Sequence, residues 1–348
     1  MAASTGLMLG IFDHMDRGAV PVAEFYENRL RLIEAYDRAD FYAYLVAEHH
    51  STPLGMAPSP GIFLSAVAQR TKRLRFGPLV YTLPLYHPLR LIEEICMLDQ
   101  MSGGRLEFGV GKGISPIETR YYGIDPDKSD AMFAEGYDLL RAGLTSKVLN
   151  FEGAFYQFKD VPLTLETIQK PYPPIWYGVV QPSSAQRAAK RGFKVMSNTA
   201  TANVRATAET YWENFVSIPG SGTKPAFGMN RFLVVADTDE AAWAIARRAY
   251  RRWHASFMNL WNLAGIEPIG VNYPPEIDGQ AADGRAVIGT PQAVLDKLQA
   301  QVEQTGVNYL GCRFAFGDMS LTESMRSIEL FAEQVKPHLR GAQRVAAE

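Results

Sequence analysis

Residues 74–111 read LRFGPLVYTLPLYHPLRLIEEICMLDQMSGGRLEFGVG and contain a complete strand–helix–strand unit. The apolar run at 74–84 predicts a buried strand, and the residues at 87–101 have the apolar spacing of a helix. Pro88 suits the first turn of that helix, where the backbone N–H has no partner within the helix. RLEFGVG at 105–111 predicts the next strand. Short strands that alternate with amphipathic helices are typical of a parallel sheet.

The same alternation runs through the rest of the chain. We expect eight strand–helix pairs, with strands at 7–12, 41–48, 74–84, 105–111, 173–180, 193–198, 227–236 and 306–316. Parallel strands that did not close on themselves would leave unpaired edges. The sequence therefore predicts an α/β fold, a single (β/α)8 or TIM barrel domain with insertions that spans residues 1–348.

Three segments do not fit this repeat, namely 112–128, 148–172 and 263–290. The last of them is rich in glycine and proline. Loops of this length in a compact domain are usually functional or disordered, and after a barrel strand they favour the active-site face. We therefore predict a mobile lid at 263–290. A passive loop that contacts a second copy of the chain is the alternative.

The composition limits the class of partner. The 348 residues are 47% hydrophobic and 21% charged, with a net charge of −2, which offers no basic surface for nucleic acid or a membrane. No stretch approaches the ~20 apolar residues that a membrane span requires. Cys96 and Cys312 lie in apolar surroundings without CxxC spacing, as structural thiols of a reducing compartment do. We expect a cytoplasmic protein that binds a small molecule or a second copy of itself.

The second predicted strand ends on Glu48, His49 and His50, at the end of a barrel strand where active-site residues gather. Neighbouring residues on a strand point to opposite faces, so the two histidines are not expected to reach one interior metal ion. No HxH or HExxH pattern supplies a further ligand, and we predict no metal site. A structural histidine pair that is satisfied by Glu48 and the next loop is the alternative to a catalytic role.

Two further strand ends carry groups that suit an anion. FGVGKG at 108–113 lacks the spacing of a phosphate-binding GxxxxGK[ST] loop, but Lys112 offers a positive charge. In QPSSAQRAA, at 181–189, Ser183 or Ser184 suits the start of a helix whose free N–H groups bind phosphate. Helix capping alone would also explain these serines.

Taken together, four segments resemble the luciferase-like flavin-dependent monooxygenase family, and in particular its bacterial luciferase α-subunit members. They are VAEHH, LPLYHPLRLIEEICMLDQMSGGRLEFGVGKG, QPSSAQRAAKRG and IGTPQAVLDKLQAQVEQTGVNYLG, and the similarity runs from Leu9 to Leu339. The resemblance implies FMN, used in its reduced form (FMNH2) and supplied by a separate NAD(P)H:flavin reductase. It also implies O2 as co-substrate, a C4a-(hydro)peroxide of the flavin, a small apolar organic substrate and a homodimer.

The resemblance also assigns roles to residues of this chain. His49 would serve as acid or base beside the flavin, while Glu48 would orient or satisfy the histidine pair. Leu79 and Val80 would form a bulge with a non-prolyl cis peptide bond that supports the flavin ring. The other cofactor-binding residues that it implies are Phe12, Lys112, Ile114, Val180, Gln181, Ser183 and Ser184, with Glu118 also lining the cavity.

The sequence departs from the family pattern in three places. Lys112 replaces one phosphate-binding arginine, and Asp130 stands where the family has a second, so we expect Asp130 to repel a phosphate. A tryptophan near the luciferase flavin falls at Asn198 or Thr199, and we do not expect light emission.

Two alternatives to the monooxygenase remain open. One is an oxidoreductase of the same barrel that uses deazaflavin F420, and the other is a non-catalytic flavin-binding subunit, against which the retained EHH argues. A set of aromatic residues near the predicted mouth indicates an apolar substrate, although core packing would also explain them: Phe12, Tyr81, Phe257 and Trp261.

Overall fold

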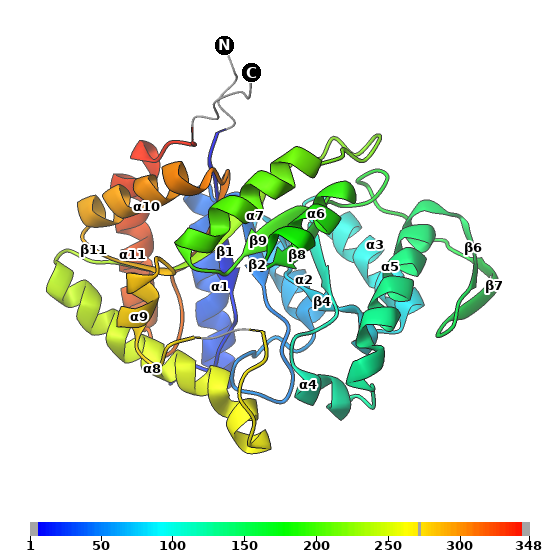
Figure 1. Ribbon diagram of the computed structural model, residues 1–348, viewed down its shortest axis with the longest axis horizontal. Helices are drawn as coiled ribbons and strands as arrows, with labels where there is room; N and C mark the ends of the chain where they lie inside the picture. The colour runs from blue at the N-terminus through cyan, green and yellow to red at the C-terminus, as the bar shows by residue number, and fades with distance from the viewer. Residues whose placement is uncertain (1–5, 271–272, 343–348) are drawn as a thin grey trace, which may run out of the picture.

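A computed structural model describes residues 6–270 and 273–342 of the chain. Parallel strands form a sheet in the order β3-β2-β1-β12-β10-β9-β8-β5-β4 (Figure 1). Their bounds are β1 (Met8–Asp13), β2 (Ala43–Val46), β3 (Arg75–Pro78), β4 (Tyr81–Thr82), β5 (Phe108–Gly111), β8 (Ile175–Val179), β9 (Lys194–Ser197), β10 (Phe227–Val235) and β12 (Tyr309–Arg313). Phe76 donates its backbone N–H to the carbonyl of Arg105 and accepts that of Glu107, which joins β3 to the residues before β5. The sheet is therefore a near-closed barrel, which confirms the predicted fold class.

Helices follow the strands as the sequence predicts. They are α1 (Val22–Arg38), α2 (Pro60–Arg70), α3 (Pro88–Met101), α5 (Ser129–Thr145), α6 (Pro182–Lys190), α7 (Thr201–Asn214), α8 (Asp239–Ala264) and α11 (Leu321–Leu330). A further helix, α10 (Pro291–Thr305), was not predicted. The expected cis peptide bond between Leu79 and Val80 is present, and it divides one strand into β3 and β4. The nine strands of the path therefore occupy eight positions in the described barrel. Cys96 and Cys312 are buried free thiols, as predicted.

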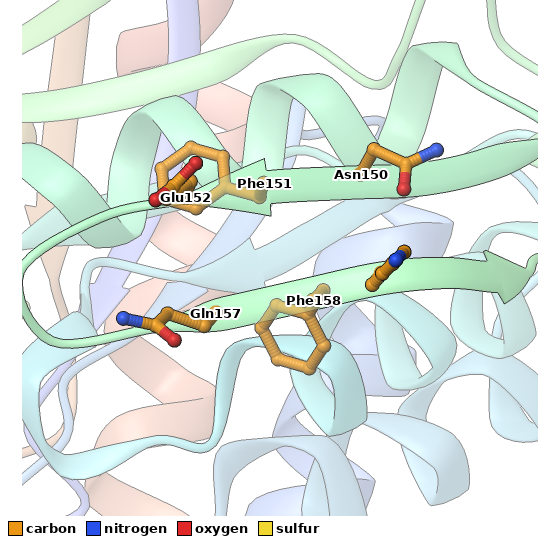
Figure 2. Close-up of a pocket in the computed structure, with 6 residues that line it drawn as sticks. Asn150, Phe151, Glu152, Gln157 and Phe158 are labelled. Carbon is orange, nitrogen blue, oxygen red and sulfur yellow. The ribbon is translucent and has the colours of Figure 1, made fainter.

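All three insertions contain regular structure that the sequence did not predict. Within 148–172, β6 (Val148–Glu152) and β7 (Gln157–Pro162) form an antiparallel hairpin that projects at the right of Figure 1. A shallow groove of about 520 Å³ lies along this hairpin (Figure 2). Within 112–128, the short helix α4 (Pro116–Tyr121) folds back towards the mouth of the barrel.

The prediction of a loop over 263–290 is wrong from Ile277 onward. This part forms α9 (Ile277–Ala282) and β11 (Ala286–Gly289), and β11 is buried and pairs with β10. The apolar run of β11 has only three residues, Ala286–Ile288, between Arg285 and Gly289, so it did not stand out as a strand. Residues 271–272 of the predicted lid lie outside the described residues, and movement of the segment stays a prediction.

The strands run from the top of Figure 1 towards α4 and the C-terminal end of α8 at the bottom. Their carboxyl ends therefore open onto the face where a barrel carries its active site. Within the described ranges, no helix combines the length and the apolar character that crossing a bilayer requires.

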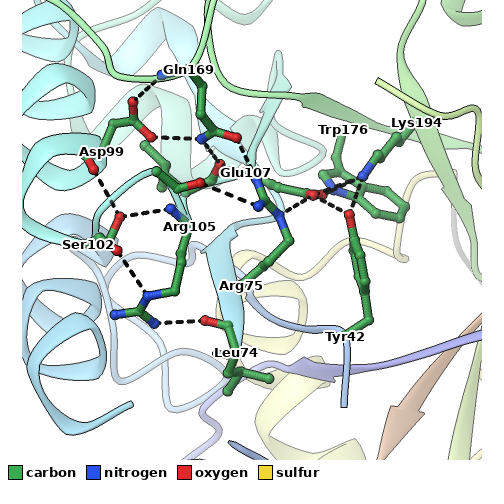
Figure 3. Close-up of polar contacts among 12 residues, drawn as sticks. Tyr42, Leu74, Arg75, Asp99, Ser102, Arg105, Glu107, Gln169, Trp176 and Lys194 are labelled. Carbon is green, nitrogen blue, oxygen red and sulfur yellow. Dashed lines mark hydrogen bonds and ion pairs between the residues drawn. The ribbon is translucent and has the colours of Figure 1, made fainter. Parts of the chain in front are cut away.

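The opposite end of the barrel is closed by a buried ionic network around Glu107 (Figure 3). Its carboxylate accepts hydrogen bonds from the hydroxyl of Tyr42 (2.5 Å) and from Nε of Arg75 (2.6 Å). It also accepts them from Nε1 of Trp176 (2.6 Å) and from Nζ of Lys194 (2.8 and 2.9 Å). These five residues come from five different strands or strand approaches, so one carboxylate fixes their relative positions.

Glu107→Gln should lower the free energy of unfolding by about 3–5 kcal/mol, because it leaves the buried ammonium of Lys194 without a charged partner. Denaturant titration measures the loss. The double variant Glu107→Gln/Lys194→Met removes both charges and should recover part of it. Glu209→Gln, at an exposed ion pair, is the matched control. Unchanged stability of Glu107→Gln would contradict a structural role for the network.

Low pH should destabilise the protein through the same carboxylate, Glu107. Burial raises the pKa of Glu107, but Lys194 and then Arg75 lower it more, to about 2 against an ordinary 4.5. A carboxylate with a depressed pKa in the folded state stabilises fully above about pH 4.5. That contribution is lost as the pH falls from there towards about 2. Between these values the protein should lose stability more steeply than Glu107→Gln does.

Candidate active site

The two adjacent histidines lie beyond the end of β2 and turn to different partners. Nδ1 of His49 lies 3.2 Å from Oε1 of Glu118. Nε2 of His50 lies 3.0 Å from Oε1 of Glu48, and its Nδ1 lies 2.7 Å from the hydroxyl of Tyr122. His50 is therefore fully engaged in local contacts, whereas His49 faces the mouth of the barrel with one carboxylate beside it.

Glu118 is the carboxylate that holds His49. Its second oxygen accepts the backbone N–H of His50 at 2.9 Å, and its own N–H is capped by the hydroxyl of Ser115. Burial raises the pKa of Glu118, but His49 and the His50 N–H outweigh burial and the pKa is lowered. Glu118 therefore presents a negative charge to His49.

The prediction that Glu48 orients both histidines is wrong for His49. Glu48 instead contacts His50 and accepts a hydrogen bond from the hydroxyl of Tyr86 at 2.5 Å. The helix that carries Glu118 is separated from His49 by 69 residues, and only the fold brings the two together.

A third histidine, which the sequence analysis missed, belongs to the same group. His14 follows β1, and its ring centroid lies 5.8 Å from that of His49. Nε1 of Trp253 donates to its Nδ1 at 3.4 Å. Burial, then Arg313 and then His49, hold the pKa of His14 well below its ordinary value, so its ring stays neutral. A histidine directly after the first strand was the signal that could have identified it.

The predicted phosphate residues lie side by side, because β5 pairs with β8 and both end at the mouth. Nζ of Lys112 forms an exposed ion pair with Asp130 at 2.8 Å. The hydroxyl of Ser184 donates to the carbonyl of Gln181 and accepts the N–H groups of Val180 and Gln181. The hydroxyl of Ser184 is therefore used in hydrogen bonds that stabilise the start of α6.

Ser183 differs from its neighbour. Its side chain is exposed at the start of α6 and forms no hydrogen bond with the described residues. Together with the free N–H groups of the helix start, it is available to an anion beside Lys112.

The glycines of FGVGKG serve the bulge at Leu79–Val80. A Cβ atom on Gly111 would lie 2.6 Å from Cγ2 of Val80, and one on Gly109 would lie 2.9 Å from Cδ1 of Leu79. Phe12 packs in the same interior cluster as Leu79. The glycine-rich pattern is therefore a requirement of packing, and only its lysine points to an anion.

A small cavity of about 20 Å³ lies beside His49, which is room for about one water molecule. Ile114 and Val180 are half-exposed on the surrounding surface. An organic ligand therefore needs a shift of side chains, above all those at the end of α8. Of the predicted apolar residues, Phe257 and Trp261 line the cavity, whereas Tyr81 is fully buried against Tyr86. The lining residues are His49, Thr52, Leu54, Ile114, Ser115, Glu118, Phe257, Leu260 and Trp261.

Comparison with known proteins identifies the family. Residues 8–309 match the family described as luciferase-like monooxygenase. The chain belongs to the luciferase-like monooxygenase family. It is 42% identical to the uncharacterised protein y4wF of Sinorhizobium fredii, over 92% of this chain and 93% of that one. It is 31% identical to limonene 1,2-monooxygenase of Rhodococcus erythropolis, over 90% of this chain and 81% of that one.

Several solved structures share the fold. The monooxygenase RslO1 from Streptomyces bottropensis superposes with a TM-score of 0.85 at 27% identity, and the match covers 95% of this chain and 99% of that one. The FMN complex of the oxygenating constituent of 3,6-diketocamphane monooxygenase from Pseudomonas putida gives 0.80 at 20% identity, covering 97% and 100%. An F420-dependent tetrahydromethanopterin reductase from Methanopyrus kandleri gives 0.67 at 18%, covering 96% and 99%. The predicted family is confirmed, and it is a family of oxidoreductases.

Asp130→Asn should raise the affinity for inorganic phosphate about two- to fivefold, because it frees Lys112 from an exposed ion pair. Lys112→Ala should lower it. Calorimetric titration at low salt measures both. Asp127→Asn makes the same charge change at an exposed neighbouring site and controls for net charge. If the Asp130 and Lys112 variants shift the affinity in the same direction, the two residues do not compete for the anion.

Proposed function

We propose that the protein is an FMN-dependent, two-component monooxygenase that oxidises a small apolar organic substrate. Reduced FMN would come from a separate NAD(P)H:flavin reductase, and O2 would be the co-substrate. The observation that carries this proposal is the His49–Glu118 pair at the barrel mouth, one strand away from the Leu79–Val80 bulge. The N–H of Leu79 donates to the carbonyl of Val46 at 2.7 Å, which fixes the bulge beside the histidine segment.

The residues at the mouth fit FMN. Lys112 and Ser183, with the start of α6, offer a cation, a hydroxyl and backbone N–H groups to a phosphate. Leu79 and Val80 offer an apolar ledge for the ring, with Phe12 and Ile114 as walls. The FMN complex of a protein with the same fold supports this choice of cofactor. When bound, reduced FMN would supply the electrons that activate O2.

The chain's own groups would manage protons and water. Glu118 would orient the ring of His49, because its carboxylate lies 3.2 Å from Nδ1. His14 is held neutral at the next position, and His50 is tied to Glu48 and Tyr122. The aromatic end of α8 leaves room for little water, and it would exclude water from the reaction when the cofactor is bound.

An F420-dependent oxidoreductase is the second candidate. The ion pair between Lys112 and Asp130 weakens the attraction for the FMN phosphate, so Lys112 does not decide between the two cofactors. Proteins that use F420 share this fold. A non-catalytic flavin-binding subunit is less consistent with the site, because His49 keeps an ordered carboxylate partner.

A homodimer fits the exposed apolar side chains on α2 and α3. Ile62 is 76% exposed, Met97 52% and Met101 46%, and the two helices pack side by side. Covering these side chains with the same face of a second copy would remove them from water.

His49→Ala should leave the fold intact and reduce product formation by about 10²–10⁴-fold, the usual effect of removing an acid–base group. The assay supplies O2, FMN, NADH and a flavin reductase, and it detects oxygenated products of a panel of apolar compounds by mass spectrometry. His338→Ala, at an exposed histidine, is the matched control. Equal product formation by His49→Ala and the parent would remove His49 from the mechanism.

A further inference from the structure

Arg313, at the end of β12, is a buried cation that the functional proposal does not use. Its side chain is 3% exposed. The guanidinium carbon lies 4.9 Å from the ring centroid of Phe12 and 4.5 Å from that of Phe232. Two aromatic faces therefore hold the guanidinium in a fixed position.

The polar contacts of Arg313 are incomplete. Nη2 donates to Oδ1 of Asn198 at 3.3 Å, while Nε and Nη1 have no hydrogen-bond partner among residues 6–270 and 273–342. No carboxylate of these residues forms an ion pair with it, in contrast to buried Arg29, which pairs with Asp13. Burial holds the pKa of Arg313 below its ordinary value, although Tyr273, which also hydrogen-bonds to it, and more weakly Asp16 raise it. A buried charge in this state costs stability, and proteins retain such a charge where a ligand completes it.

The side chain of Arg313 faces the inside of the barrel. Tyr309 lies four residues before Arg313 on β12 and packs against Trp176 in the interior. Residues separated by an even number of positions on a strand share a face, so Arg313 faces the interior as well. Asn230 lies opposite Gly311 on the neighbouring strand β10, and both atoms of its amide are buried without a partner in the described chain. Unsatisfied donors and an acceptor therefore gather on one side of the interior.

This side adjoins Phe12, on β1, but lies across the barrel from the other proposed cofactor residues. Those other residues follow β3, β5 and β8, whereas Asn198, Phe232 and Arg313 belong to the half formed by β9, β10 and β12. His14 connects the two halves, since its ring lies 5.0 Å from Phe12, against which Arg313 packs, and 5.8 Å from His49. A ligand held by Arg313 would thus reach towards His49.

We propose that Arg313 binds a carboxylate of the organic substrate, so that the substrate is an apolar molecule with one acidic group. The assignment rests on the proposed function. The free Nε–H and Nη1–H would donate charge-assisted hydrogen bonds, and the carboxylate would neutralise the buried cation. The aromatic side chains of Phe12, Phe232 and the end of α8 would enclose the apolar part.

The test compares octanoate with octan-1-ol, two probes with the same chain and different head groups. The protein should bind octanoate more tightly than octanol. Arg313→Met should lose about 10- to 100-fold in octanoate affinity, as charged hydrogen bonds predict, and keep its octanol affinity. Arg313→Lys should keep the preference for octanoate. Arg251→Met removes an exposed charge on α8 and should change neither affinity. Titration calorimetry measures both affinities for the parent protein and for the three variants.

Thermal unfolding separates a binding role from a structural one. Arg313→Met should melt at or above the temperature of the parent protein, because it removes an uncompensated buried charge. An Arg313→Met variant that is strongly destabilised or fails to fold would show a structural role and overturn the proposal. So would octanoate affinity that does not change.

Anaerobic titration with reduced FMN tests whether Arg313 binds the cofactor phosphate instead of a substrate carboxylate. Unchanged affinity of Arg313→Met for reduced FMN supports the substrate assignment. Loss of reduced FMN binding with unchanged octanoate binding would assign Arg313 to the flavin and overturn it. If the parent protein does not bind reduced FMN, the proposed function fails, while the octanoate titration still tests Arg313.

Discussion

One buried carboxylate fixes the geometry on which the rest of the molecule depends. Glu107 collects hydrogen bonds from Tyr42, Arg75, Trp176 and Lys194 at the closed end of the barrel. Each partner begins or precedes a different strand, so the network sets the spacing of those strands. The functional groups lie at the other ends of the same strands. A change in the Glu107 network would therefore move the Leu79–Val80 bulge, the histidine segment and Lys112 relative to one another.

At the mouth of the barrel, a buried negative charge and a buried positive charge lie in different halves. Glu118 carries a negative charge beside His49. On the other side of His14, Arg313 carries a positive charge whose Nε and Nη1 have no hydrogen-bond partner among the described residues. The neutral ring of His14 keeps the two apart. The proposed reaction uses the first half for the cofactor and its proton, and the further inference uses the second half to hold the substrate.

Local patterns predicted the parts of the fold that depend on local periodicity. The run at 74–111 and its repeats gave the eight barrel positions, and the resemblance gave the Leu79–Val80 cis bond. Strand β11 was not predicted because its apolar run is short and ends at Gly289. The contact of His49 with Glu118 depends on chain closure over 69 residues, which no local pattern contains.

Two other residues show what position alone can and cannot tell. His14 follows its strand as the EHH segment follows the second, so position could have identified it. The missing partners of Arg313 are visible only in the folded chain.

Anaerobic titration with reduced FMN and with reduced F420 tests the central claim most directly, because the cofactor decides the class of reaction. The account predicts that reduced FMN binds with the higher affinity, and that Asp130→Asn raises this affinity further. Tight binding of reduced F420 without measurable binding of reduced FMN would contradict it.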